Sequence, residues 1–369
     1  MPKPLPADVV KAWTAAGAKV GWVPRRYDLM DAAWFYQGEG ERPVDLPAFR
    51  FAEWKPGVIE KLPDPGADFG LDFLDAKITD DGLTELVGKK SLRSLFLFKT
   101  PVTDVGMKAV GELSGLHTLH LGGTAVTDAG LKEVGKLPNL ERLFLDDAKV
   151  TDAGLKELGG LKKLRSLHLV GVHVSGTGLE ALRGAEDLRT LSLGTYKLTD
   201  DGLKAVGKLT RLEQLSVSNS PVTDAGVKEL AALKGLKALN IGDTRITDTG
   251  LKPLAALENL EELDVSMLMR EPTNTITDAG VKEVAGLRKL RKLDLAFTAT
   301  TDAGVKELTA LGELRELKLN FTKVTDTGIQ ELAALPHLER LNVYETKVTA
   351  NGAQMLKSKL PKCVITAPR

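Results

Sequence analysis

The chain has 369 residues, and its 50 basic and 50 acidic side chains cancel to a formal net charge of zero. This balance argues against whole-surface binding to nucleic acid or anionic lipid, because such binding requires an excess of positive charge. The single cysteine, Cys363, excludes an internal disulfide framework and a multi-cysteine zinc site. No apolar run reaches about 18 residues, so we expect no insertion into a membrane.

The N-terminal segment, residues 1–10, lacks the basic start and apolar stretch of a secretory signal. This slightly favours the cytoplasm. A signal already removed from the chain would leave no trace, so the compartment stays open.

Leucines and aromatic residues divide the chain near residue 70. Only four of the 61 leucines precede residue 71, whereas 11 of the 18 aromatic residues, including all four tryptophans, lie at or before Phe73. We therefore expect three parts: an N-terminal capping region (residues 1–70), an array of repeats (71–357), and a C-terminal cap strand with a tail (358–369).

The capping region is predicted to contain two degenerate repeats. Residues 8–16 have a helical pattern, and residues 20–22 and 49–51 alternate as strands do. Residues 24–46 form an insertion between these strands. Bulky aromatic residues suit this region, because the end of a repeat array must shield an open core. The insertion adds Trp34, Phe35 and Tyr36.

The rest of the chain repeats one short unit, which reads Val-Thr-Asp-Ala-Gly-Leu at residues 126–131 and again at 150–155. Its threonine or serine recurs every 24 residues, except for one interval of 30 between Thr247 and Thr277. About twelve copies exclude coincidence and indicate a solenoid. They are marked by Thr79, Thr103, Thr127, Thr151, Ser175, Thr199, Thr223, Thr247, Thr277, Thr301, Thr325 and Thr349.

Each copy combines two periodicities. After Thr151, a predicted N-cap, leucines at 155, 158 and 161 recur at the spacing of a helix face. Asp152 lies in the first turn, where the helix dipole favours negative charge. Gly154 indicates close packing against a neighbouring turn. Leucines at 167 and 169 then alternate as in a short strand. A unit of this size buries its apolar face only by stacking on similar units.

The pattern Leu-x-x-Leu-x-Leu followed by Ile/Val-Thr-Asp-x-Gly-Leu resembles leucine-rich repeats, and is closest to the F-box-associated, cysteine-containing class as found in bacterial arrays. The resemblance covers residues 71–366 and implies an α/β fold, a right-handed horseshoe-shaped solenoid with a parallel concave sheet and convex helices. No F-box-like segment precedes residue 71, so a ubiquitin-ligase role does not carry over.

This chain departs from that class in the turn, where threonine mostly replaces cysteine. We expect these buried hydroxyls to satisfy backbone groups of the turns. Ala148, Val172 and Tyr196 interrupt the series in three consecutive repeats and predict local irregularity there. Cys363 is predicted to be a buried core thiol in the last strand. The threonines are Thr100, Thr124, Thr244, Thr298, Thr322 and Thr346.

The residue between the two leucines of each strand is expected to face the concave side. In the N-terminal third of that face, aromatic residues cluster with arginine, a composition typical of interface centres. We predict an exposed partner-binding patch there; the alternative is that Phe96 and Phe98 pack under the N-terminal insertion and only cap the core. The patch consists of Phe96, Phe98, His120, Arg142, Phe144, Asp146 and His168.

The C-terminal third is charged, and its signs alternate from strand to strand at Glu262, Lys292, Glu316 and Arg340. Cross-strand ion pairs explain this pattern without a ligand. The adjacent carboxylates of Asp264 and Asp294 are interpreted as a pair neutralised by neighbouring lysines rather than as a cation site.

Two further groups are candidates for partner contact. Six extra residues, 267–272, form a predicted rim loop, whose alternative is to fold back onto Phe297. The loop offers Met267, Leu268, Met269 and Arg270. Exposed aromatic residues follow the last strands at Phe297, Phe321 and Tyr344.

These features predict a monomeric, non-catalytic scaffold that binds a protein partner on its concave sheet. Recognition of a glycan or another surface polymer is the alternative, with Phe297, Phe321, Tyr344 and Asn342 as its platform. A purely structural spacer module is the third reading. We expect no catalytic residues, no cofactor, no metal and no nucleic-acid binding, because an open sheet face excludes water poorly and carries no convergent site.

Overall fold

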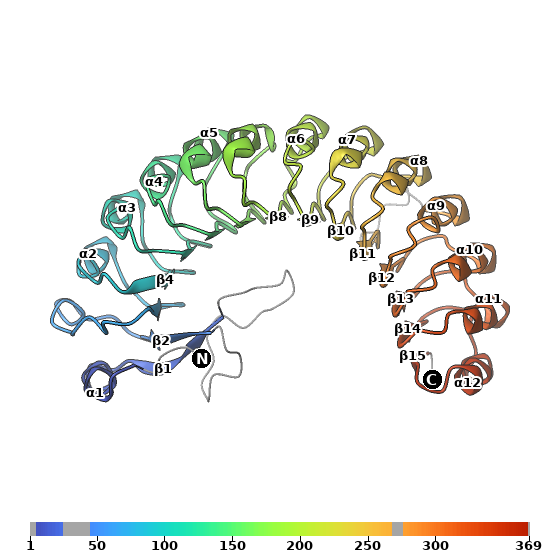
Figure 1. Ribbon diagram of the computed structural model, residues 1–369, viewed down its shortest axis with the longest axis horizontal. Helices are drawn as coiled ribbons and strands as arrows, with labels where there is room; N and C mark the ends of the chain where they lie inside the picture. Colours follow the sequence, from blue (N-terminus) through green and yellow to red (C-terminus); the bar gives the residue numbers. More distant parts are fainter. Residues whose placement is uncertain (1–4, 25–44, 268–275, 368–369) are drawn as a thin grey trace. The chain divides into compact units, whose positions relative to one another are not determined.

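The computed structural model describes residues 5–24, 45–267 and 276–367. The chain divides into two compact units, one made of residues 1–173 and 181–188 and the other of residues 174–180 and 189–369. In both units a strand, a turn and a short helix repeat, with the strands on one side of the unit and the helices on the other (Figure 1). This is the stacking of strand-turn-helix units that the periodicity predicts, and it agrees with the fold that the resemblance to leucine-rich repeats implies.

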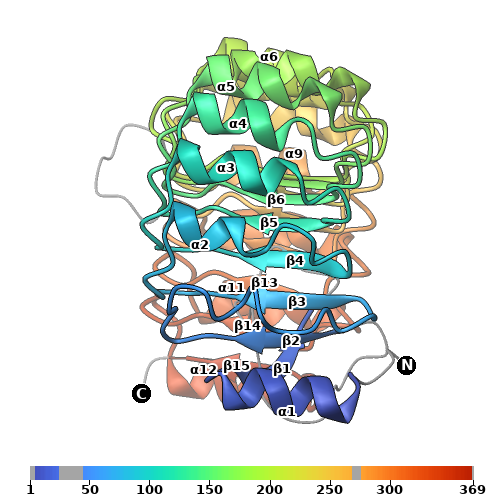
Figure 2. The ribbon, with the colours of Figure 1, turned by 90° about the vertical axis from the view of Figure 1, so that its left-hand side faces the viewer.

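In the first unit the strands succeed one another in chain order (Figure 2). From β2 onward they pair in parallel with each central leucine opposite the next, as Leu95, Leu119 and Leu143 show. The strands are β1 (Lys19–Val23), β2 (Leu46–Arg50), β3 (Phe69–Asp72), β4 (Leu92–Phe96), β5 (Thr118–His120), β6 (Arg142–Phe144) and β7 (Ser166–His168).

The first strand departs from this scheme. β1 pairs with β2 in antiparallel fashion, with Lys19 opposite Arg50 and Val23 opposite Leu46. We expected two degenerate repeats in this region, and β1 differs from the strands of the other repeats in its antiparallel direction. Its helix, α1 (Ala7–Ala15), precedes β1 instead of linking it to the next strand, as the helix of a parallel crossover would.

The remaining helices of the first unit follow one another in chain order, as Figure 2 shows for α2 to α5. Most begin at the aspartate of the repeated unit. They are α2 (Asp80–Thr84), α3 (Asp104–Gly111), α4 (Asp128–Val134) and α5 (Asp152–Glu157), which continues into the 3-10 turn η1 (Leu158–Gly160). The 3-10 segment η2 (Thr177–Gly184) takes the place of a helix where the two units divide.

The second unit repeats the pattern, and its strands also pair in parallel. They are β8 (Thr190–Ser192), β9 (Gln214–Ser216), β10 (Ala238–Asn240), β11 (Glu262–Asp264), β12 (Lys292–Asp294), β13 (Glu316–Lys318), β14 (Arg340–Asn342) and β15 (Val364–Thr366). The helices are α6 (Asp200–Val206), α7 (Asp224–Glu229), α8 (Asp248–Leu251), α9 (Asp278–Val284), α10 (Asp302–Glu307), α11 (Asp326–Glu331) and α12 (Ala350–Lys359). Four end in 3-10 turns, η3 (Leu230–Ala232), η4 (Lys252–Ala256), η5 (Leu308–Ala310) and η6 (Leu332–Ala334).

The core of each repeat is filled by the predicted leucines. In β9, β10 and β13 only the central leucine is buried, and the residues on either side are partly exposed. The helix-face leucines at 155, 158 and 161 are also buried. Both apolar periodicities of the sequence therefore face one continuous layer within each unit.

Aromatic residues fill the N-terminal core, as the composition predicts. The Trp13 indole stacks on Phe49 at 4.4 Å between ring centroids, and Phe51 stacks on Phe73 at 5.8 Å. Trp13 Nε1 donates a hydrogen bond to the Pro63 carbonyl at 3.0 Å. All four rings are buried, so they close the core at this end of the first unit.

The repeated aspartate joins most of the described repeats to the next. Its Oδ1 accepts the backbone N–H of the following threonine at 2.7–2.8 Å, and its Oδ2 accepts that threonine's hydroxyl at 2.6–2.7 Å. We call this pair of bonds the Asp–Thr clasp. It joins Asp80–Thr103, Asp104–Thr127, Asp128–Thr151, Asp200–Thr223, Asp224–Thr247, Asp248–Thr277, Asp278–Thr301, Asp302–Thr325 and Asp326–Thr349.

The clasp explains the invariable glycine of the unit. A Cβ atom on Gly154 would lie 2.2 Å from Asp128 Oδ1, and one on Gly328 would lie 2.3 Å from Asp302 Oδ1. Only a residue without a side chain leaves room for the neighbouring carboxylate, which confirms the predicted close approach. Thr151 is also the predicted N-cap, because its hydroxyl accepts the Ala153 N–H at 3.2 Å.

The turn threonines, which stand where cysteine-containing repeats have cysteine, satisfy backbone groups of the turns as predicted. The hydroxyls of Thr100, Thr124 and Thr298 each donate to the carbonyl three residues earlier at 2.6–2.7 Å, which satisfies a buried turn. Of the three predicted interruptions, the one at Tyr196 is irregular, since Tyr196 is exposed and Thr195 is buried in its place, whereas Ala148 and Val172 are buried. Cys363 is fully buried as predicted, and this burial raises the pKa of its thiol.

Candidate functional site

The patch predicted in the first unit forms a column of rings along β4 to β7. The His120 imidazole stacks on Phe144 at 5.2 Å, and Phe144 stacks on His168 at 4.4 Å. Phe98 contacts His120 edge to face at 5.1 Å. The sequence therefore predicted correctly that these side chains lie together on one face.

The prediction that this patch is exposed is wrong at its centre. Phe96 and Phe144 are each 2% exposed, and His120 is 3% exposed. Phe96 belongs to an apolar cluster with Val23, Leu46 and Ala48, so the N-terminal strands cover it. This matches the capping alternative for Phe96. An anchor must be accessible to a partner, and these three side chains are not.

The polar groups of the column are held in fixed positions. Arg142 donates to the Thr118 hydroxyl from Nε at 3.0 Å and from Nη2 at 2.6 Å. His120 Nδ1 accepts the Gly122 N–H at 3.1 Å, so the proton of a neutral His120 ring is on Nε2. Asp146 Oδ1 accepts the Val170 N–H at 2.9 Å.

Burial determines the charge of these groups. Desolvation, with a smaller contribution from His168, lowers the pKa of His120 to about 3, and burial lowers the pKa of His168 to about 4. Burial and the nearby Asp147 raise the pKa of Asp146 to about 6, against the hydrogen bond from Val170. Both imidazoles are thus neutral at pH 7, and the column is an uncharged aromatic stack rather than a cationic one.

The second unit contains an aromatic surface that is exposed. Phe297, Phe321 and Tyr344 follow β12, β13 and β14, and their exposed fractions are 38%, 43% and 46%. The rings of Phe297 and Phe321 stack at 4.1 Å with 11° between their planes. Tyr344 contacts Phe321 edge to face at 5.9 Å. We call these three residues the aromatic strip.

The backbone of the aromatic strip is strained. Phe297 and Phe321 have φ angles of +61° and +58°, in the left-handed region that bulky residues rarely adopt. Several corresponding turns use residues that tolerate this conformation better, such as Gly123, Asn219 and Asp243, while Lys99 and Glu345 adopt it as the phenylalanines do. Folding alone favours glycine, asparagine or aspartate here, so the two phenylalanines oppose the local backbone preference.

The charged face beside the aromatic strip is paired as predicted. Glu262 Oε1 lies 2.7 Å from Lys292 Nζ, and Glu316 Oε2 lies 2.7 Å from Arg340 Nη2. The same register brings Asp264 opposite Asp294, whose carboxylate is 2.9 Å from Lys318 Nζ. These contacts confirm cross-strand charge pairing. Within the described residues no group of three or more His, Cys, Asp or Glu side chains is placed to hold a metal ion.

The predicted rim loop lies mostly outside the described residues, which exclude Leu268, Met269 and Arg270. Met267 is partly exposed, and its N–H donates to the Ala296 carbonyl at 3.1 Å. The Asp248–Thr277 clasp is retained across this longer repeat, so the extra residues do not disturb the helical turn.

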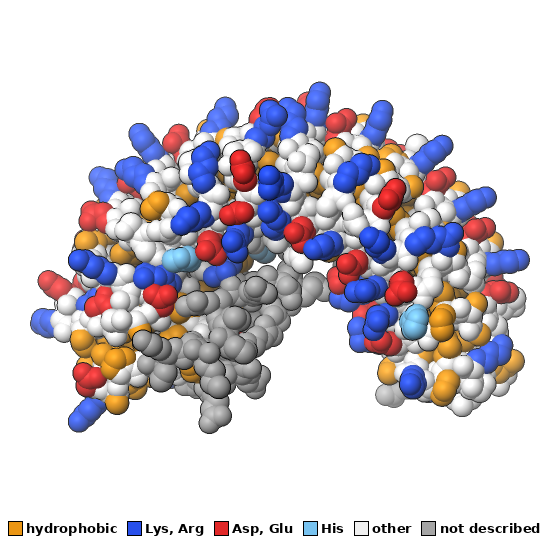
Figure 3. Space-filling view, viewed as in Figure 1, with side chains coloured by type: hydrophobic (Ala, Val, Ile, Leu, Met, Phe, Trp, Pro, Cys, Tyr) orange, Lys and Arg blue, Asp and Glu red, His pale blue; other side chains and the backbone are white. Residues whose placement is uncertain are grey.

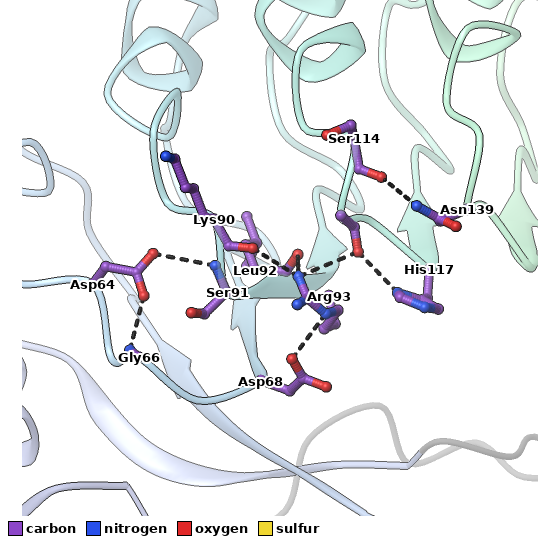
Figure 4. Close-up of polar contacts among 11 residues, drawn as sticks. Asp64, Gly66, Asp68, Lys90, Ser91, Leu92, Arg93, Ser114, His117 and Asn139 are labelled. Atoms are coloured by element: carbon purple, nitrogen blue, oxygen red, sulfur yellow. Dashed lines mark hydrogen bonds and ion pairs between the residues drawn. The ribbon is translucent and has the colours of Figure 1, made fainter.

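Another surface is formed by the residues that come just before each strand, and we call it the flank. It was not identified as a candidate site from the sequence. In the first unit Arg93, Asp68 and Asp64 on this flank have partners within the protein (Figure 4). Arg93 Nε lies 2.9 Å from Asp68 Oδ1, and its Nη1 donates to the Lys90 carbonyl at 2.8 Å. Asp64 accepts the N–H groups of Gly66 and Ser91.

In the second unit the same flank contains a groove of about 550 Å³. The sequence signal that marks it is Gly235, which stands where a neighbouring repeat carries Arg211 and so leaves space beside it. The groove is lined by Arg189, Arg211, Glu213, Gly235, Lys237, Asn259, Glu261 and Lys289.

Within the ranges that the structure describes, every helix is too short or too polar to cross a membrane.

Comparisons with known proteins agree with this fold. A family model described as a leucine-rich repeat matches residues 236–255 and 314–333. The structure is similar to the crystal structure of an internalin from Listeria monocytogenes, with a TM-score of 0.64 and 24% identity over 82% of this chain and 80% of that one. No curated protein matches the sequence. Since 524 solved chains match, the likeness identifies a fold rather than one activity. The chain therefore has a leucine-rich-repeat fold, and two of its segments match the leucine-rich repeat family model.

Proposed function

We propose that this protein is a non-catalytic scaffold that binds a protein partner through the aromatic strip, Phe297, Phe321 and Tyr344. The observation that carries the proposal is an exposed aromatic cluster built on strained turns. Exposed apolar clusters favour macromolecular contact, and aromatic side chains dominate the energetics of protein interfaces. Strain that local folding does not require is typical of functional positions.

The ring geometry favours a protein over the glycan alternative. A sugar ring needs an open aromatic face, and the stack of Phe297 on Phe321 at 4.1 Å covers one face of each ring. Their edges instead form an apolar ridge, which suits aliphatic or aromatic side chains of a partner.

Charge near the ridge further limits the partner. Two lysines lie close to the strip in the sequence: Lys323 follows Phe321 by two residues, and Lys347 follows Tyr344 by three. Both are exposed, and no described carboxylate forms an ion pair with either. An apolar segment flanked by acidic residues therefore fits this surface. Rim charges of this kind guide association more than they add to affinity.

The experiment compares capture by immobilised protein from a lysate of the cells that produce it. The variants are Phe297→Ser/Phe321→Ser and the control Tyr196→Ser, which removes an aromatic residue that is 77% exposed outside the strip. We expect the double variant to lose the captured protein at least tenfold, whereas the control retains it. A glycan array is probed in parallel.

Three outcomes contradict the proposal. Equal capture by the double variant and the wild type would place the interface elsewhere. Binding to the glycan array that depends on Phe297 and Phe321 would favour the glycan reading. Capture of nothing by any form would favour the structural spacer.

A further inference from the structure

The groove on the flank of the second unit has an uneven distribution of charge. Four of its lining side chains are cationic and two are carboxylates, which leaves a formal charge of +2. Figure 3 shows Lys and Arg side chains in blue interspersed with Asp and Glu in red over the visible face of this unit. The groove therefore combines a positive excess with a mixed pattern of sign.

Both carboxylates of the groove are already occupied. Glu213 lies 2.7 Å from Lys237 Nζ through Oε2 and 3.5 Å from Arg189 Nε through Oε1. Glu261 Oε2 lies 3.1 Å from Arg291 Nη1. Glu261 and Arg291 neutralise each other, whereas Glu213 faces two cations, so neither carboxylate offsets the charge of the remaining cations.

Those cations are Arg211 and Lys289. Lys289 Nζ donates to Asn259 Oδ1 at 2.7 Å, and Lys163 makes the same contact with Asn139 in the first unit, so this is a feature of the repeat. Arg211 is exposed, and none of the described residues forms a hydrogen bond or ion pair with its guanidinium. Arg93, on the corresponding flank of the first unit, has both an aspartate and carbonyl partners.

Space for a ligand exists beside Arg211 because of Gly235. A Cβ atom at Gly235 would meet only the Leu212 carbonyl oxygen, at 3.6 Å, so no neighbouring side chain fills this position. A guanidinium that presents its fork of donors to an open groove is suited to a carboxylate, which it binds through two parallel hydrogen bonds.

We infer that this groove binds an acidic peptide segment, with a carboxylate on Arg211 and a second on Lys289. The groove favours a peptide over a uniform polyanion, because the paired carboxylates of Glu213 and Glu261 interrupt its row of cations and offer no site for a further anionic group. A peptide can alternate acidic and neutral side chains and avoid them. The inference rests on the proposed scaffold function and adds a second contact region to it.

The test uses the full chain and a blocked eight-residue peptide of alternating glutamate and serine. Binding is measured by isothermal titration at low ionic strength, beside a peptide with glutamine in place of glutamate. We expect only the acidic peptide to bind, with an affinity that falls at least tenfold between about 20 and 200 mM salt, since the contacts are exposed.

Three variants locate the site. Arg211→Glu should weaken binding of the acidic peptide at least tenfold. Gly235→Leu should weaken it without any change of charge, because it fills the groove, and the open surroundings of Gly235 allow the variant to fold. Arg245→Glu is the control, with the same change of charge at an exposed arginine that follows β10 rather than preceding a strand.

The inference is overturned if Arg211→Glu and Arg245→Glu weaken binding equally, or if the acidic peptide does not bind. It is also overturned if inorganic phosphate or a sulfated polysaccharide binds more tightly than the peptide. The Phe297→Ser/Phe321→Ser variant separates the two proposals, because it should retain the peptide even where it loses the captured protein.

Discussion

At the scale of single residues, one aspartate per repeat has three roles. It lies in the first turn of its helix, accepts two hydrogen bonds from the next repeat, and occupies the space left by that repeat's glycine. The cap and the close approach were predictable from residue type. The clasp was not, because its acceptor and donor lie 23 residues apart in most repeats and local spacing does not pair them.

The contribution of the clasp to stability can be tested with two neighbouring aspartates in the first turn of α6, of which only Asp200 forms a clasp. Asp200→Ala removes the acceptor of the Thr223 N–H and hydroxyl, so we expect a loss of about 1–3 kcal/mol in the free energy of unfolding. Asp201→Ala changes the same charge in the same turn but leaves the clasp intact, and should cost less than about 0.5 kcal/mol. Denaturant unfolding followed by circular dichroism measures both, and equal losses would refute the clasp as a major contribution.

At the glycine of the repeated unit, packing and helix propensity predict opposite effects of an alanine substitution on the free energy of unfolding. Gly328 lies inside α11, where alanine would normally be favourable by about 1 kcal/mol. The clash with Asp302 should instead make Gly328→Ala destabilising by about 1–3 kcal/mol. Gly312→Ala, with nothing within 4 Å of its new Cβ, should be close to neutral. A stabilised Gly328→Ala protein would contradict this packing.

At the scale of the elements, the strands β4 to β7 align aromatic and ionisable side chains into one buried column. The sequence placed these residues on one face correctly, because every second strand residue points the same way. It gave the burial of Phe96 only as the alternative, and it did not predict the burial of Phe144 and His120. Phe96 is covered by Val23, Leu46 and Ala48, and the pairing of β1 and β2 that brings them there is not visible in a local pattern.

Burial of the column makes the first unit sensitive to acid. The unfolded chain binds a proton at His120 below pH 6.5, whereas the folded chain does so only near pH 3, so folding loses stability as the pH falls through this window. His168 acts in the same direction down to about pH 4. Asp146 opposes them between pH 6 and 3.8, because its pKa is raised in the folded state.

The two histidines outweigh the single carboxylate. We therefore compare the wild type with His120→Gln, which lacks the imidazole. Between pH 6.5 and 4.5 the free energy of unfolding of the wild type should fall, relative to that of the variant, by about 1.4 kcal/mol for each pH unit. Tryptophan fluorescence in denaturant titrations reports on this unit, since all four tryptophans precede residue 71. Parallel pH profiles for the two proteins would contradict the neutral, buried state of His120.

At the scale of the whole molecule, the repeat period fixes most of the architecture. A 24-residue recurrence with two apolar periodicities was sufficient to predict the strands of the repeats, their helices, the helix N-caps and the buried leucines. Function was harder to predict, because it depends on departures from the repeat. Phe297 and Phe321 stand where several other turns carry glycine, asparagine or aspartate, but their strain becomes apparent only with the backbone angles.

The central claim, that the aromatic strip contacts a protein partner, is tested most directly by site-specific photocrosslinking. Phe321→p-benzoylphenylalanine places a crosslinker on the strip, and the same substitution at Tyr196 places one on an exposed site outside it. After irradiation in a lysate of the producing cells, we predict a discrete protein adduct from position 321 and none from position 196. Equal adducts from both positions, or no protein adduct from position 321, would contradict the claim.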